Sequence, residues 1–281
     1  MRVCVLAAFL GGLSAQDKPA YVLYSSQGKR LSYTALLRKA EKADVILFGE
    51  LHNNPIAHWL AYELVRDLHA QHPSRLQLGL EMLETDQQPH LDQYLRGALP
   101  ELEGKITLWP NFATDYAPLV AYARAMKIPC FGTNAPQRLV RQVSRSGLAA
   151  LEGWSETDKA YVAPLPFPRL DSLPTYKQLD SLAQAHGLPA EPFRLAQMLR
   201  DATMAYTISR QWRPGQIFFH LNGRYHSDYG EGIAAYLRLY RPGLRLLILS
   251  TEEAPEPQRY RPPSGLADII LVVPASMTKT H

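Results

Sequence analysis

Two tetrads in the sequence place a histidine three positions after a glycine: Gly49-Glu50-Leu51-His52 and Gly223-Arg224-Tyr225-His226. Each begins at or just after the end of an apolar run of the kind that forms a buried strand. A glycine at a strand end permits a sharp turn, which directs the following histidine back over the sheet edge. Because imidazole and carboxylate groups transfer protons and bind metals, the two tetrads are candidates for one shared site.

A carboxylate at the end of another apolar run adds to these candidates. Glu81 ends the run of residues 76–81, where an ionised carboxylate needs a hydrogen-bonding, cationic or metal partner. Arg200, on a predicted helix, is a candidate partner, either within a site or as an ion pair that anchors the helix to the sheet. If the protein is an enzyme, the predicted catalytic residues are Glu50, His52, Glu81, Arg200 and His226; for a divalent metal the predicted ligands are His52, His58, Glu81 and His226.

The elements that must position these residues alternate between strands and helices. Apolar runs predict strands at residues 44–49, 76–81, 128–132, 216–221, 244–250 and 267–273. Amphipathic stretches predict helices at residues 55–70, 87–96, 116–127, 175–186 and 193–211. This alternation is typical of an α/β fold with a mostly parallel sheet flanked by helices. Because parallel strands end at one edge of the sheet, the candidate residues that follow them should meet there.

Residues 147–192 follow a different pattern, with a proline-rich stretch and no strand periodicity. We expect a helical insertion or cap there, between two parts of the α/β core at residues 20–146 and 193–281. Residues 253–264 carry four prolines and are expected to form a loop.

The N-terminus has the features of a secretory signal peptide. Arg2 precedes an apolar run over residues 3–13, and small residues follow before the polar Gln16-Asp17-Lys18. We expect residues 1–16 to be removed and the protein to be exported, to the periplasm or to an association with the outer membrane. Cys130 is then the only cysteine, which excludes an internal disulfide and a cysteine-based metal site.

Composition and motifs argue against several other functions. The 30 Lys and Arg residues barely outnumber the 26 Asp and Glu residues and form no block, so no nucleic-acid partner is expected. The sequence has neither the G-x-S-x-G element of a serine hydrolase nor a glycine-rich phosphate-binding loop. No apolar run after the first twenty residues is long enough to span a bilayer.

The sequence resembles the ChaN-like haem-binding family, part of a wider group with the Tiki and TraB proteins and the erythromycin esterases. The resemblance extends through most of the chain beyond the signal peptide. It rests on these motifs: Gly49-Glu50-Leu51-His52-Asn53-Asn54-Pro55 continuing to His58, Glu81-Met82 with Gln87-Gln88, Asn134-Ala135-Pro136, His186-Gly187-Leu188-Pro189, the segment from Gln197 to Ala205, and Asn222-Gly223-Arg224-Tyr225-His226.

Two positions depart from the family pattern. The family often has His-Asp-Asn where this chain has His52-Asn53-Asn54, and the lost carboxylate weakens a metal-hydrolase interpretation. The family often has His-Cys-Gly where this chain has His186-Gly187, which puts the details of the helical insertion in question.

The resemblance implies a haem-binding protein of the cell envelope that serves haem and iron acquisition. It implies haem as the cofactor, a homodimer around paired haems, and an outer-membrane haem transporter as a partner. It also implies a tyrosine and a histidine near the iron. In this chain the predicted helical insertion offers Tyr176, His186 and Tyr161, with Tyr176 the first choice, while Arg169 or Lys177 can pair with the haem propionates.

Two alternatives stay open on the sequence alone. One is a metal-dependent hydrolase or protease of the Tiki or erythromycin-esterase type. In that case a divalent metal ion or the His52–Glu50 pair activates water, and Arg200 steadies an oxyanion. The other is an envelope scaffold without catalytic activity. Whether the protein is an enzyme is therefore open at this point.

Overall fold

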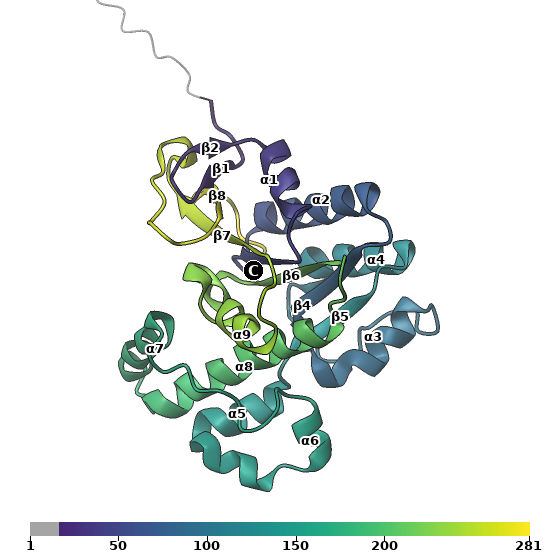
Figure 1. Cartoon of the computed structure of the whole chain (residues 1–281), viewed down its shortest axis with the longest axis vertical. Helices are drawn as coiled ribbons and strands as arrows, with labels where there is room; N and C mark the ends of the chain where they lie inside the picture. The colour runs from purple at the N-terminus through teal and green to yellow at the C-terminus, as the bar shows by residue number, and fades with distance from the viewer. Residues whose placement is uncertain (1–16) are drawn as a thin grey trace, which may run out of the picture.

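An eight-stranded β-sheet forms the centre of the molecule in the computed structural model, which describes residues 17–281 (Figure 1). The strands lie in the order β2-β1-β8-β7-β3-β6-β4-β5. Their bounds are β1 Val22–Ser25, β2 Arg30–Leu31, β3 Val45–Glu50, β4 Leu76–Glu84, β5 Cys130–Asn134, β6 Ile217–Gly223, β7 Leu246–Ala254 and β8 Ile269–Pro274. The signal peptide predicted at residues 1–16 lies outside the described residues.

The strands from β3 to β8 run parallel to one another, which confirms the predicted α/β fold with a mostly parallel sheet. At one edge, β1 is antiparallel to both β2 and β8. These two edge strands are too short to show a strand periodicity, so the sequence did not predict them. The loop prediction at residues 253–264 is wrong at its start, because Glu253 and Ala254 still belong to β7.

Helices cover both faces of the sheet. Their bounds are α1 Tyr33–Ala40, α2 Pro55–Gln71, α3 Gln88–Leu95, α4 Ala117–Met126, α5 Gln137–Ser146, α6 Glu156–Ala160, α7 Pro174–Ala185, α8 Ala190–Gln211 and α9 Ile233–Tyr240. One apolar core joins α1 to α4 with one face, and a second joins α5, α7, α8 and α9 with the other. Along β3, Ile46 and Phe48 enter the first core while Val45 and Leu47 enter the second, as expected for a parallel strand buried on both faces.

Residues 147–192 contain helices and no strand, in keeping with the predicted helical insertion. A short 3-10 helix at Gly147–Gly153 precedes α6 and α7. In Figure 1, α5, α6 and α7 gather with α8 at the lower end of the molecule. The helix α8 begins at Ala190, slightly before the predicted start at residue 193. Among residues 17–281, no helix is both long enough and apolar enough to cross a bilayer.

Candidate functional site

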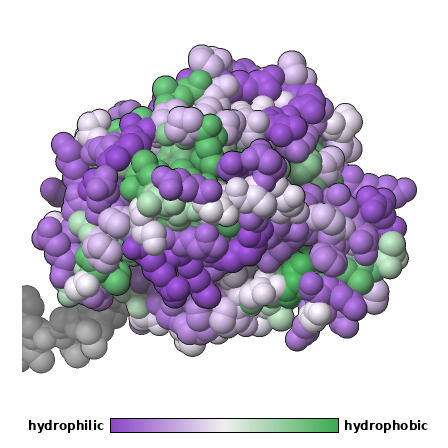
Figure 2. Space-filling model, turned by 90° about the horizontal axis from the view of Figure 1, so that it is seen from below, coloured by the Kyte–Doolittle hydropathy of each residue, from purple (hydrophilic) through white to green (hydrophobic). Residues whose placement is uncertain are grey.

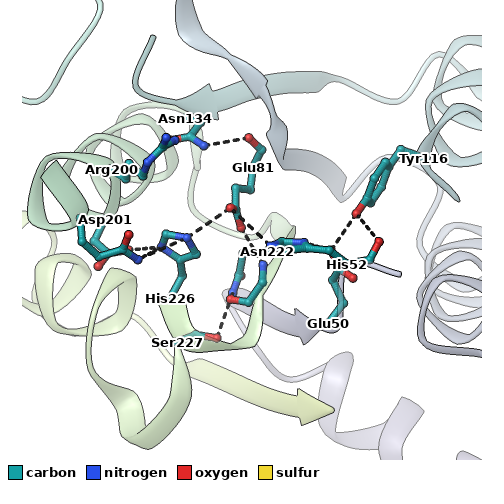
Figure 3. Close-up of polar contacts among 12 residues, drawn as sticks. Glu50, His52, Glu81, Tyr116, Asn134, Arg200, Asp201, Asn222, His226 and Ser227 are labelled. Carbon is teal, nitrogen blue, oxygen red and sulfur yellow. Dashed lines mark hydrogen bonds and ion pairs between the residues drawn. The ribbon is translucent and has the colours of Figure 1, made fainter. Parts of the chain in front are cut away.

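The ends of β3, β4 and β6 bring together side chains from three distant parts of the sequence (Figure 3). Glu50, at the end of β3, pairs in register with Gly223 at the end of β6. On the other side of β6, Leu80 of β4 pairs with Leu221, and the side chain of the next residue, Glu81, reaches the backbone of Gly223. We call the resulting group the strand-end cluster; its members are Glu50, His52, His58, Glu81, Asp115, Tyr116, Asp201 and His226.

Glu81 is a buried carboxylate whose oxygens both have partners. The backbone N–H of Gly223 donates to Oε2 at 2.6 Å, and Nε2 of His226 lies 3.2 Å from Oε1. Burial disfavours the charged form, but the charges of His226 and His52 and the N–H of Gly223 outweigh it and hold the pKa of Glu81 below its usual value. Glu81 is therefore ionised at neutral pH.

His226 lies between two buried carboxylates. Its Nε2 faces Glu81, and its Nδ1 donates to Oδ1 of Asp201 at 2.5 Å. Burial alone would lower the pKa of His226, but the charges of Glu81 and Asp201 outweigh it and raise this pKa to about 10. The hydroxyl of Tyr176 donates to the other oxygen of Asp201 at 2.7 Å. His226 is thus a fixed cation within a continuous line from Tyr176 to Glu81.

Glu50 organises the other half of the cluster. Its Oε1 accepts from Nδ1 of His52 at 2.7 Å and from the hydroxyl of Tyr116 at 3.0 Å, while its Oε2 accepts from Nε2 of His58 at 2.8 Å. Burial opposes ionisation, but the two histidines outweigh it and lower the pKa of Glu50. The Nδ1 of His58 lies 3.4 Å from Oδ2 of Asp115. Both predicted histidines of the first motif therefore bind one carboxylate.

His52 is the exposed member of the cluster. Its side chain is 40% exposed, and its Nε2 lies 4.0 Å from Oε1 of Glu81. Its ring packs edge-on against Trp109, with the ring centres 4.8 Å apart. A Cβ at position 223 would lie 2.7 Å from the His52 ring, so the glycine of the second tetrad makes room for the histidine of the first. This close approach explains why glycine stands at that strand end.

The start of α2 holds the first motif in place. The side chain of Asn54 caps the helix by accepting from the backbone N–H groups of Ile56 and Ala57, each at 3.1 Å, and Pro55 occupies the first turn. Because α2 begins directly after the turn that carries His52, His58 reaches back to Glu50 from its second turn. The sequence Asn54-Pro55 therefore fixes the spacing between the two histidines.

Arg200, the candidate partner of Glu81, forms no ion pair with it. Within residues 17–281 no carboxylate lies within 4.0 Å of its guanidinium, and Glu81 is satisfied by His226 and Gly223 instead. Arg200 donates to the side-chain carbonyl of Gln137 at the start of α5. Burial lowers the pKa of Arg200, although Glu81 and Glu84 act in the opposite direction. The residue belongs to the edge of the strand-end cluster without joining its hydrogen bonds.

Several members of the cluster had no clear signal in the sequence. Asp115 and Tyr116 precede α4 in a segment without strand-end context, and Asp201 follows Arg200 within the long helix α8. Only the apolar surroundings of Asp201 in its helix could have marked it as a buried charge that needs partners. His220 lies within β6, where it bonds to Thr133 and Asn222, and burial lowers its pKa to about 4.

A groove of about 510 Å³ lies between α5 and α8. We call it the α5–α8 groove. Its apolar lining is Val140, Leu188, Pro189, Phe193 and Ala196, and its polar lining is Gln137, Arg141, Ser144, Arg145, Gln197 and Arg200. Figure 2 shows the lower end of the molecule, where apolar side chains (green) are exposed in patches between hydrophilic ones (purple). The side-chain amide of Gln197 lies 3.0 Å from Nδ1 of His226, so the groove borders the strand-end cluster.

The predicted metal site is not supported. Residues 17–281 contain no group of three or more His, Cys, Asp or Glu side chains arranged to hold a metal ion. Of the four predicted ligands, His226 is a cation with both nitrogens directed at carboxylates, and His58 faces Glu50 and Asp115. A metal ligand must be a neutral imidazole with a free nitrogen, so this set does not fit a divalent metal.

Comparison with known proteins identifies the family. A family model described as haem-binding uptake, Tiki superfamily, ChaN, matches residues 36–237, more than half of the chain. The protein belongs to this family. No curated protein matches the chain.

The chain is also similar to several solved structures. A structure described as cofacial haem binding to ChaN of Campylobacter jejuni has a TM-score of 0.69 and 18% identity, covering 90% of this chain and 96% of that chain. A Bacillus cereus protein has a TM-score of 0.50 and 12% identity, covering 85% of this chain and 90% of that one. An erythromycin esterase has a TM-score of 0.46 and 14% identity, covering 82% and 77%. At these identities the first two similarities establish the fold alone.

The three residues predicted to bind haem in this ChaN-family chain do not lie together. His186 is exposed at the end of α7, two positions before Leu188 of the α5–α8 groove. Tyr176 is fully buried, and its hydroxyl bonds to Asp201. Tyr161 lines a separate cavity of about 300 Å³. Of the three, His186 is the one close in sequence to the α5–α8 groove, through Leu188 and Pro189.

Proposed function

We propose that this ChaN-family protein binds haem in the α5–α8 groove. The observation that carries the proposal is the combination of apolar walls with three arginines, Arg141, Arg145 and Arg200, along one groove. A porphyrin has two apolar faces and carries two carboxylates at one edge. Ligand sites of this kind are apolar clefts with a few well-placed polar groups, and their volumes include that of this groove.

The charge around the groove distinguishes it from an apolar cavity of similar volume. An apolar cavity of about 480 Å³ lies between α3 and α4, but its rim carries the acidic residues Glu101 and Glu103. Carboxylates on a ligand would be repelled there. By contrast, neither Arg141 nor Arg145 forms an ion pair with another residue of 17–281, so both are available to a carboxylate ligand. Electrostatic complementarity therefore favours the α5–α8 groove.

His186 is the proposed iron ligand. Its imidazole is exposed and its side chain makes no hydrogen bond with another described residue, so a ring nitrogen is free to bind iron. Bound haem would supply a ferric centre that takes nitrogen or phenolate oxygen ligands. Ligation by Tyr176 would require its phenol to leave Asp201 and the core, where burial and that charge raise its pKa well above the ordinary value. Tyr176 stays a prediction, second to His186.

The proposed cellular role follows the resemblance. We propose that the protein is exported to the periplasm or the outer membrane, serves iron acquisition, and exchanges haem with an outer-membrane transporter. A homodimer also belongs to this proposal. Leu182 and Leu188, beside His186, are each nearly half exposed, and a second copy facing this end would cover them. Light scattering of the purified protein with and without haemin tests this: the mass of two chains would support the homodimer, and the mass of one chain in both samples would contradict it.

A haemin titration of the purified protein tests the binding proposal. We expect a saturable Soret band with a stoichiometry of one haem per chain, and a changed Soret position and weaker binding in His186→Ala. The matched control is His281→Ala, an exposed histidine away from the groove, which should behave as the unaltered protein. A titration without saturation would refute haem binding. Saturable binding that His186→Ala leaves unchanged, but Tyr176→Phe alters, would instead assign the iron to Tyr176.

One observation favours a second candidate function, a metal-free hydrolase. His52 is an exposed imidazole oriented by Glu50, with its free Nε2 at the edge of the cluster. A histidine held by a buried carboxylate is the arrangement of a general base that activates water. A panel of ester and amide substrates tests this candidate. Activity that is lost in His52→Ala and retained in His281→Ala would support it.

A further inference from the structure

The α5–α8 groove has two chemically different ends. Gln137, at the start of α5, bonds to Arg200 in the middle of α8, whereas Gly147, directly after α5, lies close to Pro192 in the first turn of α8. The two helices therefore run in opposite directions along the groove. The outer end carries Leu188, beside the exposed His186, and the inner end carries Arg200.

One face of α8 spans the distance between these ends. Phe193, Gln197 and Arg200 are spaced by four and three positions, so their side chains share a side of the helix. From Phe193 to Arg200 the helix rises by about 10 Å. Over this distance the lining of the groove changes from the apolar Phe193 to the cationic Arg200, which lies next to the strand-end cluster.

Most N–H donors of Arg200, at the inner end of the groove, have no partner among residues 17–281. A guanidinium carries five N–H donors, and the only described partner of Arg200 is the carbonyl of Gln137. Two buried carboxylates that act on Arg200 are already bound: Glu81 by His226 and Gly223, and Asp201 by His226 and Tyr176. A third carboxylate that acts on it, Glu84, forms no ion pair with Arg200 within residues 17–281. A largely buried cation without a carboxylate partner is costly, unless a ligand supplies the anion.

We propose that Arg200 and Gln197 form an anion receptor at the inner end of the groove, where a carboxylate of the bound ligand pairs with the Arg200 guanidinium. The ligand class is an apolar, planar molecule that carries a carboxylate, and the inference rests on the proposed haem binding. Gln197 lines the groove and also contacts His226, so the carboxylate that Arg200 binds lies beside the His226 end of the strand-end cluster. The groove and the strand-end cluster are then one site.

Titrations with haemin and with haemin dimethyl ester test this receptor. The ester keeps the iron and the apolar ring but has no free carboxylate. We expect the unaltered protein to bind haemin at least tenfold more tightly than the ester, equal to about 1.4 kcal/mol. Arg200→Gln should lose this preference by weakening haemin binding tenfold or more while leaving ester binding unchanged. Arg66→Gln, an exposed arginine on α2, is the matched control and should keep the preference.

The outcomes separate the inference from the proposed function. If haemin and its ester bind equally and Arg200→Gln changes neither, the receptor is refuted while haem binding stands. If neither compound binds, both are refuted. If Arg200→Gln does not fold, as judged by circular dichroism, Gln197→Ala and Arg200→Lys replace it. The lysine variant should then retain part of the preference for haemin, because it keeps the charge without the planar fork of donors.

Discussion

Raising the pH from 7 to 9 should destabilise the fold through His226. Burial opposes its charge, but Glu81 and Asp201 outweigh burial and raise its pKa to about 10, whereas a histidine in an unfolded chain has a pKa of about 6.5. Between these values the folded state keeps a proton that the unfolded state has released. The loss is about 1.4 kcal/mol per pH unit, so two units should lower the free energy of unfolding by about 3 kcal/mol.

The sign and the window follow from the two pKa values. The stabilisation by His226 is fully present below pH 6.5 and is lost as the pH rises towards 10. His52 has a raised pKa and acts in the same direction, but its partly exposed ring contributes less. Above pH 9 the thiol of Cys130, whose pKa burial raises to about 12, adds a further loss. The window from pH 7 to 9 therefore isolates the histidines best.

Urea unfolding followed by circular dichroism at pH 7, 8 and 9 measures this slope. His226→Gln should be less stable at pH 7 and should lack most of the slope, whereas the exposed-site control His281→Gln should keep it. If His226→Gln does not fold, an NMR titration of the His226 ring replaces it. A free energy of unfolding that stays constant or rises between pH 7 and 9 would show that His226 is not held as a cation.

Four further results are expected. Gly49→Ala should lower the free energy of unfolding by about 2 kcal/mol or more, because its Cβ would lie 2.7 Å from the carbonyl oxygen of Leu249; an unchanged urea midpoint would contradict this close approach. Tyr176→Phe should cost about 1–3 kcal/mol in urea unfolding by leaving an oxygen of buried Asp201 without its donor, and a neutral result would contradict that hydrogen bond. His220, with a pKa of about 4, should stay neutral in an NMR titration at pH 5, and its contribution to stability should be lost as the pH falls from 6.5 towards 4. Cys130 should react with a thiol reagent at pH 8 only after urea is added, and rapid reaction of the folded protein would contradict its burial.

Much of the fold could be predicted because its strands are buried on both sides. Residues 45–48 form an unbroken apolar run that feeds two cores, and such a run between amphipathic helices indicates a parallel strand. The edge hairpin of β1 and β2 could not be found in this way, because its strands have four and two residues. The helices α1, α5 and α9 were also not predicted.

The convergence of the candidate residues could be predicted, but their pairing could not. Because the strands are parallel, Glu81 and His226, which follow two of them, must lie at the same edge of the sheet. This says nothing about which side chains they contact there. Their actual partners depend on register and helix packing: Gly223 donates to Glu81 because β4 and β6 pair at Leu80 and Leu221. For the same reason the sequence could not show that His226 and Gly223, and not Arg200, are the partners of Glu81.

Tyr176 shows a different limit of the sequence. A tyrosine in a polar-looking helix gives no sign of whether its hydroxyl faces solvent or a buried charge. In the structure the helix α7 packs against α8, which brings the phenol to Asp201 and removes it from the surface. His186, ten residues later, ends the same helix and stays exposed. The resemblance implied that these two residues lie together near the iron, but in the structure one is buried and the other is exposed.

The electrostatics of the cluster limit where chemistry can occur. Glu50, Glu81 and Asp201 each have partners on both oxygens, and His226 has carboxylates on both nitrogens. Buried side chains whose polar atoms all have partners keep their charge and position, so these residues are suited to hold the site in a fixed geometry. Among the described residues of the cluster and its edge, His52 and Arg200 keep free donor or acceptor atoms that face outward. A ligand of this site must therefore engage one or both, and only Arg200 borders an apolar groove.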